Sequence, residues 1–246
     1  MKTALVTGAG SWLGQAIAKH LAAQGYATAI HVHRAIQTGE ALQQSICSAG
    51  GHAMLLAGDL TKEADVKALC RTWSSQCPSD HLDVLIHNAG VYDPVPFLEA
   101  DAETWSLGID TTATAFYFLT REMLPHLRKS STGRIITIGD SSCEHLGARG
   151  RAPSYHMGKT GLVMLMRSFA RCEAPHGVTC NMISPGILEN SISPPPLDQM
   201  PTGRYGTTAD ILHAIDFLIH PAARYCSGSN LILSGGWNLG SSENLD

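Results

Sequence analysis

Short apolar runs alternate along the chain with longer segments in which apolar residues recur at a helical spacing. The short runs are rich in β-branched residues and cover residues 3–7, 27–33, 53–58, 83–90, 134–139, 178–184 and 230–236. Such alternation is typical of βαβ units, in which helices cover both faces of a mostly parallel sheet. The pattern therefore predicts an α/β fold built on one doubly wound parallel sheet of about seven strands.

The segments between these runs carry the helix period. Leu13, Ile17 and Leu21 recur at that spacing after the first run. No composition shift, long linker or internal repeat divides the chain, so we expect residues 1–246 to form one domain. The only proline-rich stretch falls within residues 187–201. Because proline disfavours regular structure, we expect a variable substrate loop there, at the carboxyl ends of the strands.

Composition and charge narrow the class of partner. Of the 246 residues 44% are hydrophobic and 15% charged, and the formal net charge of -4 includes no block of like charge. We therefore expect a small-molecule partner and neither nucleic acid nor a membrane. Seven cysteines without a C-x-x-C pair argue against a zinc site and for a reducing compartment. With no signal-like start and no apolar stretch of bilayer length, the expected location is the cytoplasm.

Glycines follow the first apolar run in the manner of a strand-turn-helix nucleotide site. Gly8 would permit the tight turn and Gly14 the close approach of helix and strand, with a pyrophosphate at the helix N-terminus. The spacing from Gly8 is not G-x-G-x-x-G, so a glycine-rich turn without ligand is the alternative. Trp12 and Leu13 stand between the outer glycines. Trp12 can stack on a flat ring but brings no positive charge, and core packing is its alternative.

The second apolar run ends in a His-x-His-Arg sequence. His33 and Arg34 stand where an acidic residue would hold the ribose in an NAD site. Basic residues suit the 2′-phosphate of NADP, because arginine can form two charge-assisted hydrogen bonds with it. The expected cofactor is therefore NADP (NADPH). A solvated charge at Arg34 and a same-face pair of His31 and His33 are the alternatives, and we identify no further ligands for a metal.

Several motifs follow one another in a characteristic order. They are Thr7-Gly8 with Gly14, Gly58-Asp59-Leu60, residues 87–90 (HNAG), 133–139 (GRIITIG), Tyr155 with Lys159, 181–186 (NMISPG), 203–206 (GRYG) and 226–236 (CSGSNLILSGG). With them the chain resembles the short-chain dehydrogenases/reductases, which have a Rossmann-like fold, over essentially its whole length. Within that family it looks most like the pteridine reductases, which share the His-x-His-Arg run and carry Asp where most relatives have a catalytic Ser.

This resemblance assigns roles to particular residues. It implies that the Tyr155 hydroxyl gives a proton to the substrate, while the Lys159 ammonium lowers the pKa of that hydroxyl and holds the nicotinamide ribose. Their separation of four residues puts both on one helix face, and a nearby cation does favour phenolate. The implied cofactor contacts are Gly8, Trp12, Leu13, Gly14, His33, Arg34, Asp59, Leu60, Asn88, Ala89, Gly90, Tyr155, Lys159, Pro185, Gly186 and Ile187. A strand-end cap at Asp59, a strand stop at Asn88 and a turn at Pro185 are the structural alternatives.

The third catalytic position has two candidates. Asp140 follows the GRIITIG motif where the family has its Ser, but it lies fifteen residues before Tyr155. Ser142 lies thirteen residues before Tyr155, which is the more usual gap. We favour Asp140, because a strand end is fixed by the sheet whereas a loop absorbs insertions at little cost. A turn cap is the alternative role for this carboxyl.

The resemblance also concerns the middle of the chain, where we expect one helix from Ala102 to Leu127. The family's Asn that holds a water near the lysine aligns with Thr112, or with Asp110 after a shift of two residues. Relatives form tetramers partly through this helix, so a homotetramer is expected.

Three functions compete. The first is an NADPH-dependent oxidoreductase that transfers hydride to a C=O or C=N bond of a small cytosolic substrate, pterin-like by resemblance. The second is a 3-oxoacyl thioester or general ketone reductase. The third is a non-catalytic NADP-binding sensor, suggested by departures from the family pattern at Trp12, Thr112, Asp140 and Ser234.

Overall fold

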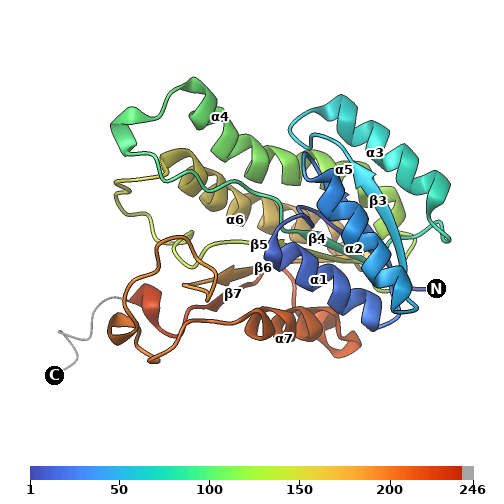
Figure 1. Cartoon of the computed structure of the whole chain (residues 1–246). Coiled ribbons are helices and arrows are strands. Elements are labelled where there is room, and N and C mark those ends of the chain that lie inside the picture. The colour runs from blue at the N-terminus through green and yellow to red at the C-terminus, as the bar shows by residue number, and fades with distance from the viewer. Residues whose placement is uncertain (240–246) are drawn as a thin grey trace.

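The computed structural model describes residues 1–239, so residues 240–246 of the expected domain lie outside the described residues. Seven parallel strands form one sheet in the order β3-β2-β1-β4-β5-β6-β7, as Figure 1 shows. They are β1 (Thr3–Val6), β2 (Ala27–Val32), β3 (His52–Ala57), β4 (Val84–His87), β5 (Arg134–Ile138), β6 (Thr179–Pro185) and β7 (Asn230–Leu233). Each lies within one of the apolar runs or extends it by a single residue, and the predicted sheet is confirmed.

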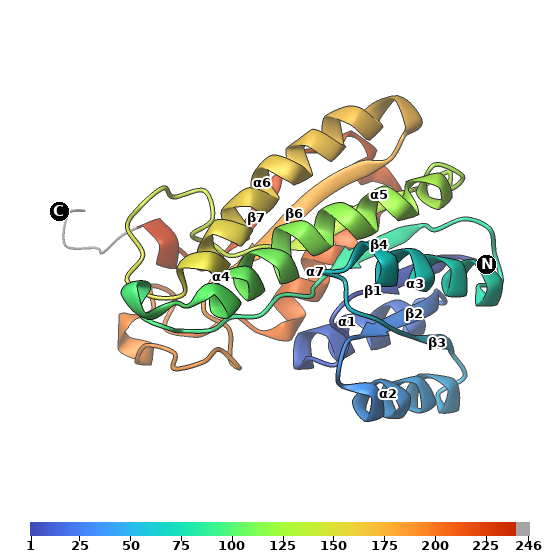
Figure 2. The ribbon, with the colours of Figure 1, turned by 90° about the horizontal axis from the view of Figure 1, so that it is seen from above.

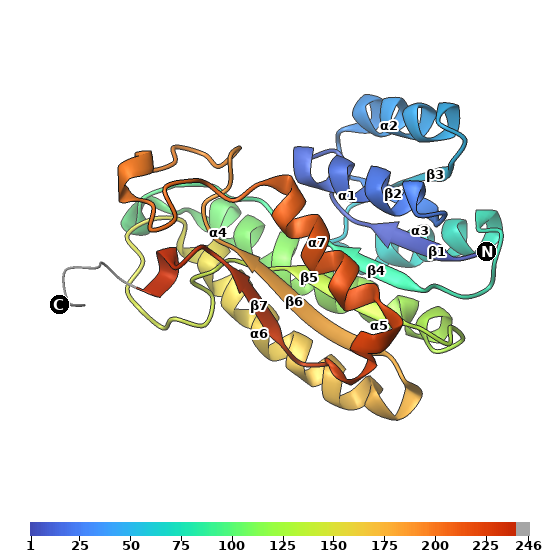
Figure 3. The same cartoon turned by 90° about the horizontal axis from the view of Figure 1, so that it is seen from below.

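Helices cover both faces of the sheet, as predicted. One face carries α1 (Trp12–Ala23), α2 (Ile36–Ser48) and α7 (Thr208–Ile219) (Figure 3). The other face carries α3 (Glu63–Gln76), α5 (Ala115–Leu127) and α6 (Pro153–Glu173) (Figure 2). The helix α4 (Ala102–Ile109) precedes α5 on this second face. Ile17 and Ile215 are buried on the first face, Leu119 and Met166 on the second. The strands are apolar because both of their faces are covered.

The remaining helical pieces are short. They are the 3₁₀ segments η1 (Phe97–Glu99), η3 (Ala174–His176), η4 (Leu197–Gln199), η5 (Pro221–Tyr225) and η6 (Trp237–Leu239), and the π-helical segment η2 (Asp110–Thr114). Residues 187–201 follow β6 and contain no regular element except η4. The Tyr205 hydroxyl donates to the Pro195 carbonyl oxygen at 2.7 Å and ties this loop to the start of α7.

The middle helix differs from the prediction of one regular helix from Ala102 to Leu127. The π-helical segment η2 separates α4 from α5. The Thr111 and Thr112 hydroxyls each donate to a carbonyl oxygen four residues earlier, at 2.7 Å. Hydroxyl groups that bond back in this way compete with the backbone ladder and bend helices. A prediction from apolar spacing alone does not register that competition.

Within residues 1–239 no helix is long and apolar enough to cross a bilayer. All seven cysteines are free thiols.

Candidate active site

The turn between β1 and α1 brings the predicted glycines together. Ser11 caps α1, and its hydroxyl accepts the Gly14 N–H at 3.1 Å. Gly8 has φ +62°, and a Cβ there would lie 2.9 Å from the Ala89 Cα. A Cβ at Gly14 would overlap the Gly8 carbonyl oxygen. Both glycines are therefore required by close backbone approach, and the α1 N-terminus faces outward at the carboxyl edge of the sheet.

Asn88 and Ala89 brace this turn from the end of β4. The Thr7 hydroxyl accepts the N–H groups of Asn88 and Ala89, both at 3.0 Å. The Asn88 amide donates to the carbonyl oxygens of Thr7 and Gly8, both at 3.1 Å. The motif ending in Gly90 thus fixes the turn against the neighbouring strand, a function beyond the strand stop that the sequence suggested.

A cavity of about 480 Å³ opens beside this turn. Its walls come from the glycine turn, the end of β2, the segment after β3 and the end of β4, and they include Gly8, Gly10, Ser11, His31, His33, Arg34, Asp59, Leu60, Asn88, Ala89 and Gly90. Eight of the predicted cofactor residues are therefore brought together around one space. It lies outside the carboxyl ends of β1 and β4, where the strand order reverses and where doubly wound sheets bind ligands.

Charged groups gather at the outer end of the cavity. The Asp59 carboxylate lies 3.9 Å from the His33 ring and 3.5 Å from the Lys62 ammonium, and Arg34 is exposed next to His33. Asp59 also caps its own turn by accepting the N–H and hydroxyl of Thr61. Burial raises the pKa of Asp59, but these hydrogen bonds and the His33 charge outweigh it and hold the pKa below its usual value.

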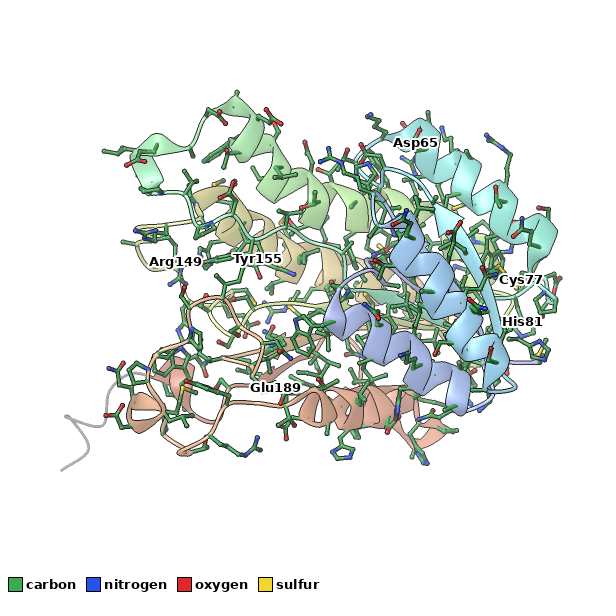
Figure 4. All side chains as sticks on the ribbon, viewed as in Figure 1. Asp65, Cys77, His81, Arg149, Tyr155 and Glu189 are labelled. Atoms are coloured by element: carbon green, nitrogen blue, oxygen red, sulfur yellow. The ribbon has the colours of Figure 1, made fainter. Side chains whose placement is uncertain are left out.

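Tyr155 and Lys159 lie on one face of α6. The Lys159 ammonium lies 5.5 Å from the centre of the Tyr155 ring and donates to the Ile138 carbonyl oxygen at 2.6 Å. Burial lowers the pKa of Lys159 to about 8 against the opposing effect of Asp140. Burial, Asp140 and Tyr92 all raise the pKa of Tyr155, so the lowered pKa that the resemblance implied is not found in this structure. Figure 4 shows Tyr155 on the same side of the molecule as Arg149 and Glu189, far from His81 and Cys77.

Asp140 lies two residues beyond β5, close enough to influence the charge of both Tyr155 and Lys159. One of its carboxylate oxygens accepts the Ser142 N–H at 2.8 Å and the Ser142 hydroxyl at 2.5 Å. The turn cap suggested as an alternative is therefore present. The two candidates for the third catalytic position are thus joined by a hydrogen bond, and the choice between them stays a prediction.

Thr112 lies in η2 against α6, where a Cβ at Gly158 would overlap its hydroxyl oxygen. That hydroxyl donates to the Gly108 carbonyl oxygen at 2.7 Å and contacts the Ile109 carbonyl oxygen at 3.1 Å. Asp110 instead accepts from the Thr114 hydroxyl. Thr112 therefore lies beside the helix that carries Tyr155 and Lys159, as expected. Its hydroxyl, however, donates to carbonyl oxygens of its own helix.

The remaining predicted residues lie at the same edge of the sheet. The Pro185 carbonyl oxygen accepts the Ser141 N–H at 2.9 Å, Gly186 donates to Leu233, and Ile187 accepts from Gly206. Trp12 begins α1 with 37% of its side chain exposed, so core packing, its structural alternative, is wrong. Leu13 is 7% exposed and packs into the core beneath the turn.

Sequence reasoning missed Tyr92, Thr111 and the linking role of His31. The Tyr92 ring meets the Tyr155 ring edge-on at 5.0 Å, and the Thr111 hydroxyl accepts the Val91 N–H at 3.1 Å and lines the cavity. An aromatic residue two positions after the Asn-Ala-Gly motif was the available signal for Tyr92. In the part of the chain that the structure describes, no group of three or more His, Cys, Asp or Glu could hold a metal ion.

The sequence profile described as short chain dehydrogenase matches residues 2–197. The chain belongs to the short-chain dehydrogenase family. Its relatives include the 3-oxoacyl-[acyl-carrier-protein] reductases of Staphylococcus aureus and Vibrio harveyi, each 30% identical over 243 residues, or 96% of this chain and 97% and 96% of theirs. This short-chain dehydrogenase is thus an oxidoreductase of a family that uses nicotinamide cofactors.

Solved structures agree with this membership. A variant of a Serratia marcescens short-chain dehydrogenase/reductase gives a TM-score of 0.87 at 28% identity, covering 96% of this chain and 98% of that one. A blue fluorescent protein from a metagenomic library, solved in complex with NADPH, gives 0.85 at 27% identity, covering 96% and 97%.

Proposed function

We propose that this short-chain dehydrogenase is an NADPH-dependent reductase that transfers hydride to a C=O or C=N bond of a small substrate. The observation that carries the proposal is the meeting of two features at one edge of the sheet. The Tyr155–Lys159 pair lies beside Asp140, and the cavity walled by the glycine turn and the basic end of β2 opens at the same edge.

The described residues suit a dinucleotide. Gly8 and Gly14 leave room at the α1 N-terminus that a Cβ would fill, and backbone N–H groups there suit a pyrophosphate. His33 and Arg34 would hold a 2′-phosphate, and Asp59 with Leu60 would lie along the adenosine. The NADPH complex of the blue fluorescent protein, at a TM-score of 0.85, supports the choice of NADPH. Asn88, Ala89 and Gly90 would line the middle of the cofactor, while Pro185, Gly186 and Ile187 would lie near its nicotinamide end.

The bound cofactor supplies the hydride, and the protein supplies the proton. As hydride joins the substrate carbon, the π bond breaks and the Tyr155 hydroxyl gives its proton to the oxygen or nitrogen, which leaves an alcohol or amine. The Lys159 ammonium stabilises the resulting phenolate. Because Lys159 is only 4% exposed, this charge acts in a weakly screened environment.

Asp140 is the proposed third member of the site. A protonated carboxyl can donate to a ring nitrogen or carbonyl oxygen, whereas an ionised one repels a negative substrate. Asp140 in the position of the usual Ser, and Trp12 left partly exposed at the turn, support a pterin as the first candidate substrate. The names of the two curated relatives support a 3-oxoacyl thioester as the second. Family membership and the intact Tyr155–Lys159 pair favour an enzyme over a sensor.

We also propose that the protein works as a homotetramer in the cytoplasm. The exposed apolar side chains of Trp105, Tyr117 and Met164 on α4, α5 and α6 support assembly through this helical face. Seven free thiols suit a reducing compartment.

The test is NADPH oxidation by the purified protein against dihydrobiopterin, an acetoacetyl thioester, and simple quinones and diketones, with Tyr155→Phe as the control. Turnover that the control abolishes is the expected result, and the substrate turned over decides between the two candidates. Turnover of every substrate at the same rate by Tyr155→Phe would contradict the proposal.

A further inference from the structure

His31 is a buried polar residue near the carboxyl end of β2, which lies between β1 and β3 in the sheet. Its side chain is 2% exposed, although it lines the cavity beside the glycine turn. A buried imidazole requires hydrogen-bond partners for both ring nitrogens. His31 finds them on the two neighbouring strand ends.

The two partners fix the state of the ring. Nδ1 lies 3.4 Å from the Gly8 backbone nitrogen, which can only donate, and Nε2 lies 3.0 Å from the Gly58 carbonyl oxygen, which can only accept. Nδ1 must therefore be unprotonated and Nε2 must carry the proton. A second proton on Nδ1 would point at the Gly8 N–H.

These two contacts join opposite walls of the cavity. Gly8 begins the turn in front of α1, and Gly58 directly precedes Asp59. The His31 carbonyl oxygen also accepts the Ala9 N–H at 2.9 Å, so two successive amides of the turn are held by one residue. Backbone pairing alone would leave the Gly8 N–H without its acceptor.

We propose that His31 is a positioning residue for the dinucleotide: its neutral imidazole sets the spacing between the glycine turn and the segment after β3. The inference rests on the proposed binding of NADPH in this cavity. The pyrophosphate would lie at the turn and the adenosine at Asp59, so the distance between these walls determines whether both ends of the cofactor are held together.

The surroundings of the ring keep it neutral over the working pH range. Burial lowers the pKa of His31 to about 4, and His33 acts in the same direction while Asp59 and the Gly58 carbonyl oppose it. His87 is the other buried imidazole close enough to interact with it.

Substitutions at His31 separate the two hydrogen bonds. Leu removes both, while Asn places an amide oxygen near the position of Nδ1 and keeps an acceptor for Gly8. His31→Leu should weaken NADPH binding about tenfold or more, and His31→Asn should recover at least half of that loss on a logarithmic scale. The matched control is His87→Leu, since His87 is equally buried but bonds the Thr120 hydroxyl at 2.9 Å on the α5 side. Its NADPH affinity should stay within about threefold of wild type.

Fluorescence titration with NADPH gives these affinities, and thermal unfolding records the stability of each variant. Unchanged affinity in His31→Leu, or equal weakening in His31→Leu and His87→Leu, would overturn the proposal. Nitrogen NMR of ¹⁵N-histidine-labelled protein without cofactor provides a separate test, with the His31 signal assigned from His31→Asn. We expect one neutral tautomer, protonated on Nε2, from pH 5 to 8. Titration near pH 6.5 would overturn the proposal, and because NADPH is absent this result is independent of the proposed function.

Discussion

The buried charge of Lys159 should lower the free energy of unfolding, and Lys159→Met tests this directly. Lys159 is 4% exposed, and burial lowers its pKa from 10.5 to about 8. A difference of this size corresponds to about 3 kcal/mol by which folding disfavours the charged form. Methionine removes the charge with little change of shape. It also removes the hydrogen bond to the Ile138 carbonyl oxygen, a loss of about 1 kcal/mol.

The variant should therefore be about 2 kcal/mol more stable than wild type at pH 7, although it loses turnover. The pH dependence gives a sharper test. Between the folded pKa of about 8 and the unfolded value of 10.5, the unfolded chain binds more protons, so stability rises with pH through this group. From pH 7 to pH 9 the wild type should gain about 1.3 kcal/mol that the variant does not gain.

Urea unfolding of both proteins at pH 7 and pH 9, at one protein concentration, measures the difference. Titrating groups that do not interact with Lys159 contribute equally to the two proteins and cancel. The advantage of Lys159→Met should shrink from about 2 to about 1 kcal/mol. A variant less stable than wild type at pH 7, or an advantage that does not change with pH, would refute the reasoning.

Three further predictions concern the turn, a buried imidazole and the π-helical segment. Gly14→Ala should abolish NADPH binding in a fluorescence titration, because its Cβ would overlap the Gly8 carbonyl oxygen. The control Gly161→Ala should bind normally, since its Cβ would meet only ordinary contacts. Normal binding by both variants would argue against a cofactor turn. Burial lowers the pKa of His87 to about 3, so the free energy of unfolding falls as pH falls below 6.5, by up to about 1.4 kcal/mol per pH unit. In His87→Gln the midpoint of urea unfolding should therefore depend less steeply on pH in this window. An unchanged dependence would contradict the assignment. Thr112→Val should keep kcat within about threefold of wild type, because the Thr112 hydroxyl donates to carbonyl oxygens of its own helix. A loss of more than about tenfold would show that the hydroxyl takes a direct part in proton transfer.

The sheet could be predicted from sequence because its five inner strands, β2, β1, β4, β5 and β6, are buried along their whole length and are therefore mostly apolar. The close approach at Gly8 and Gly14, and the helix-face pair of Tyr155 and Lys159, are also local features of sequence. Each can be recognised from the residue types and their spacing along the chain, although the contact that requires Gly8 to be glycine is made with Ala89 on a distant strand.

Other parts of the site depend on contacts between distant segments. The edge-on meeting of Tyr92 with Tyr155 joins residues 63 positions apart, and His31 bonds Gly8 and Gly58 across two strands. The π-helical turn at Thr112 depends on hydroxyl groups competing for helix carbonyls. None of these follows from apolar spacing, because each is set by the tertiary arrangement.

The most direct test of the central claim follows the hydride itself. The protein would be incubated with NADPH carrying deuterium at C4 and with the substrate found in the turnover panel, and the product examined by mass spectrometry. We predict deuterium on the former carbonyl or imine carbon with wild type and no product with Tyr155→Phe, which should still bind NADPH. Product without deuterium, or equal labelling by Tyr155→Phe, would contradict the account.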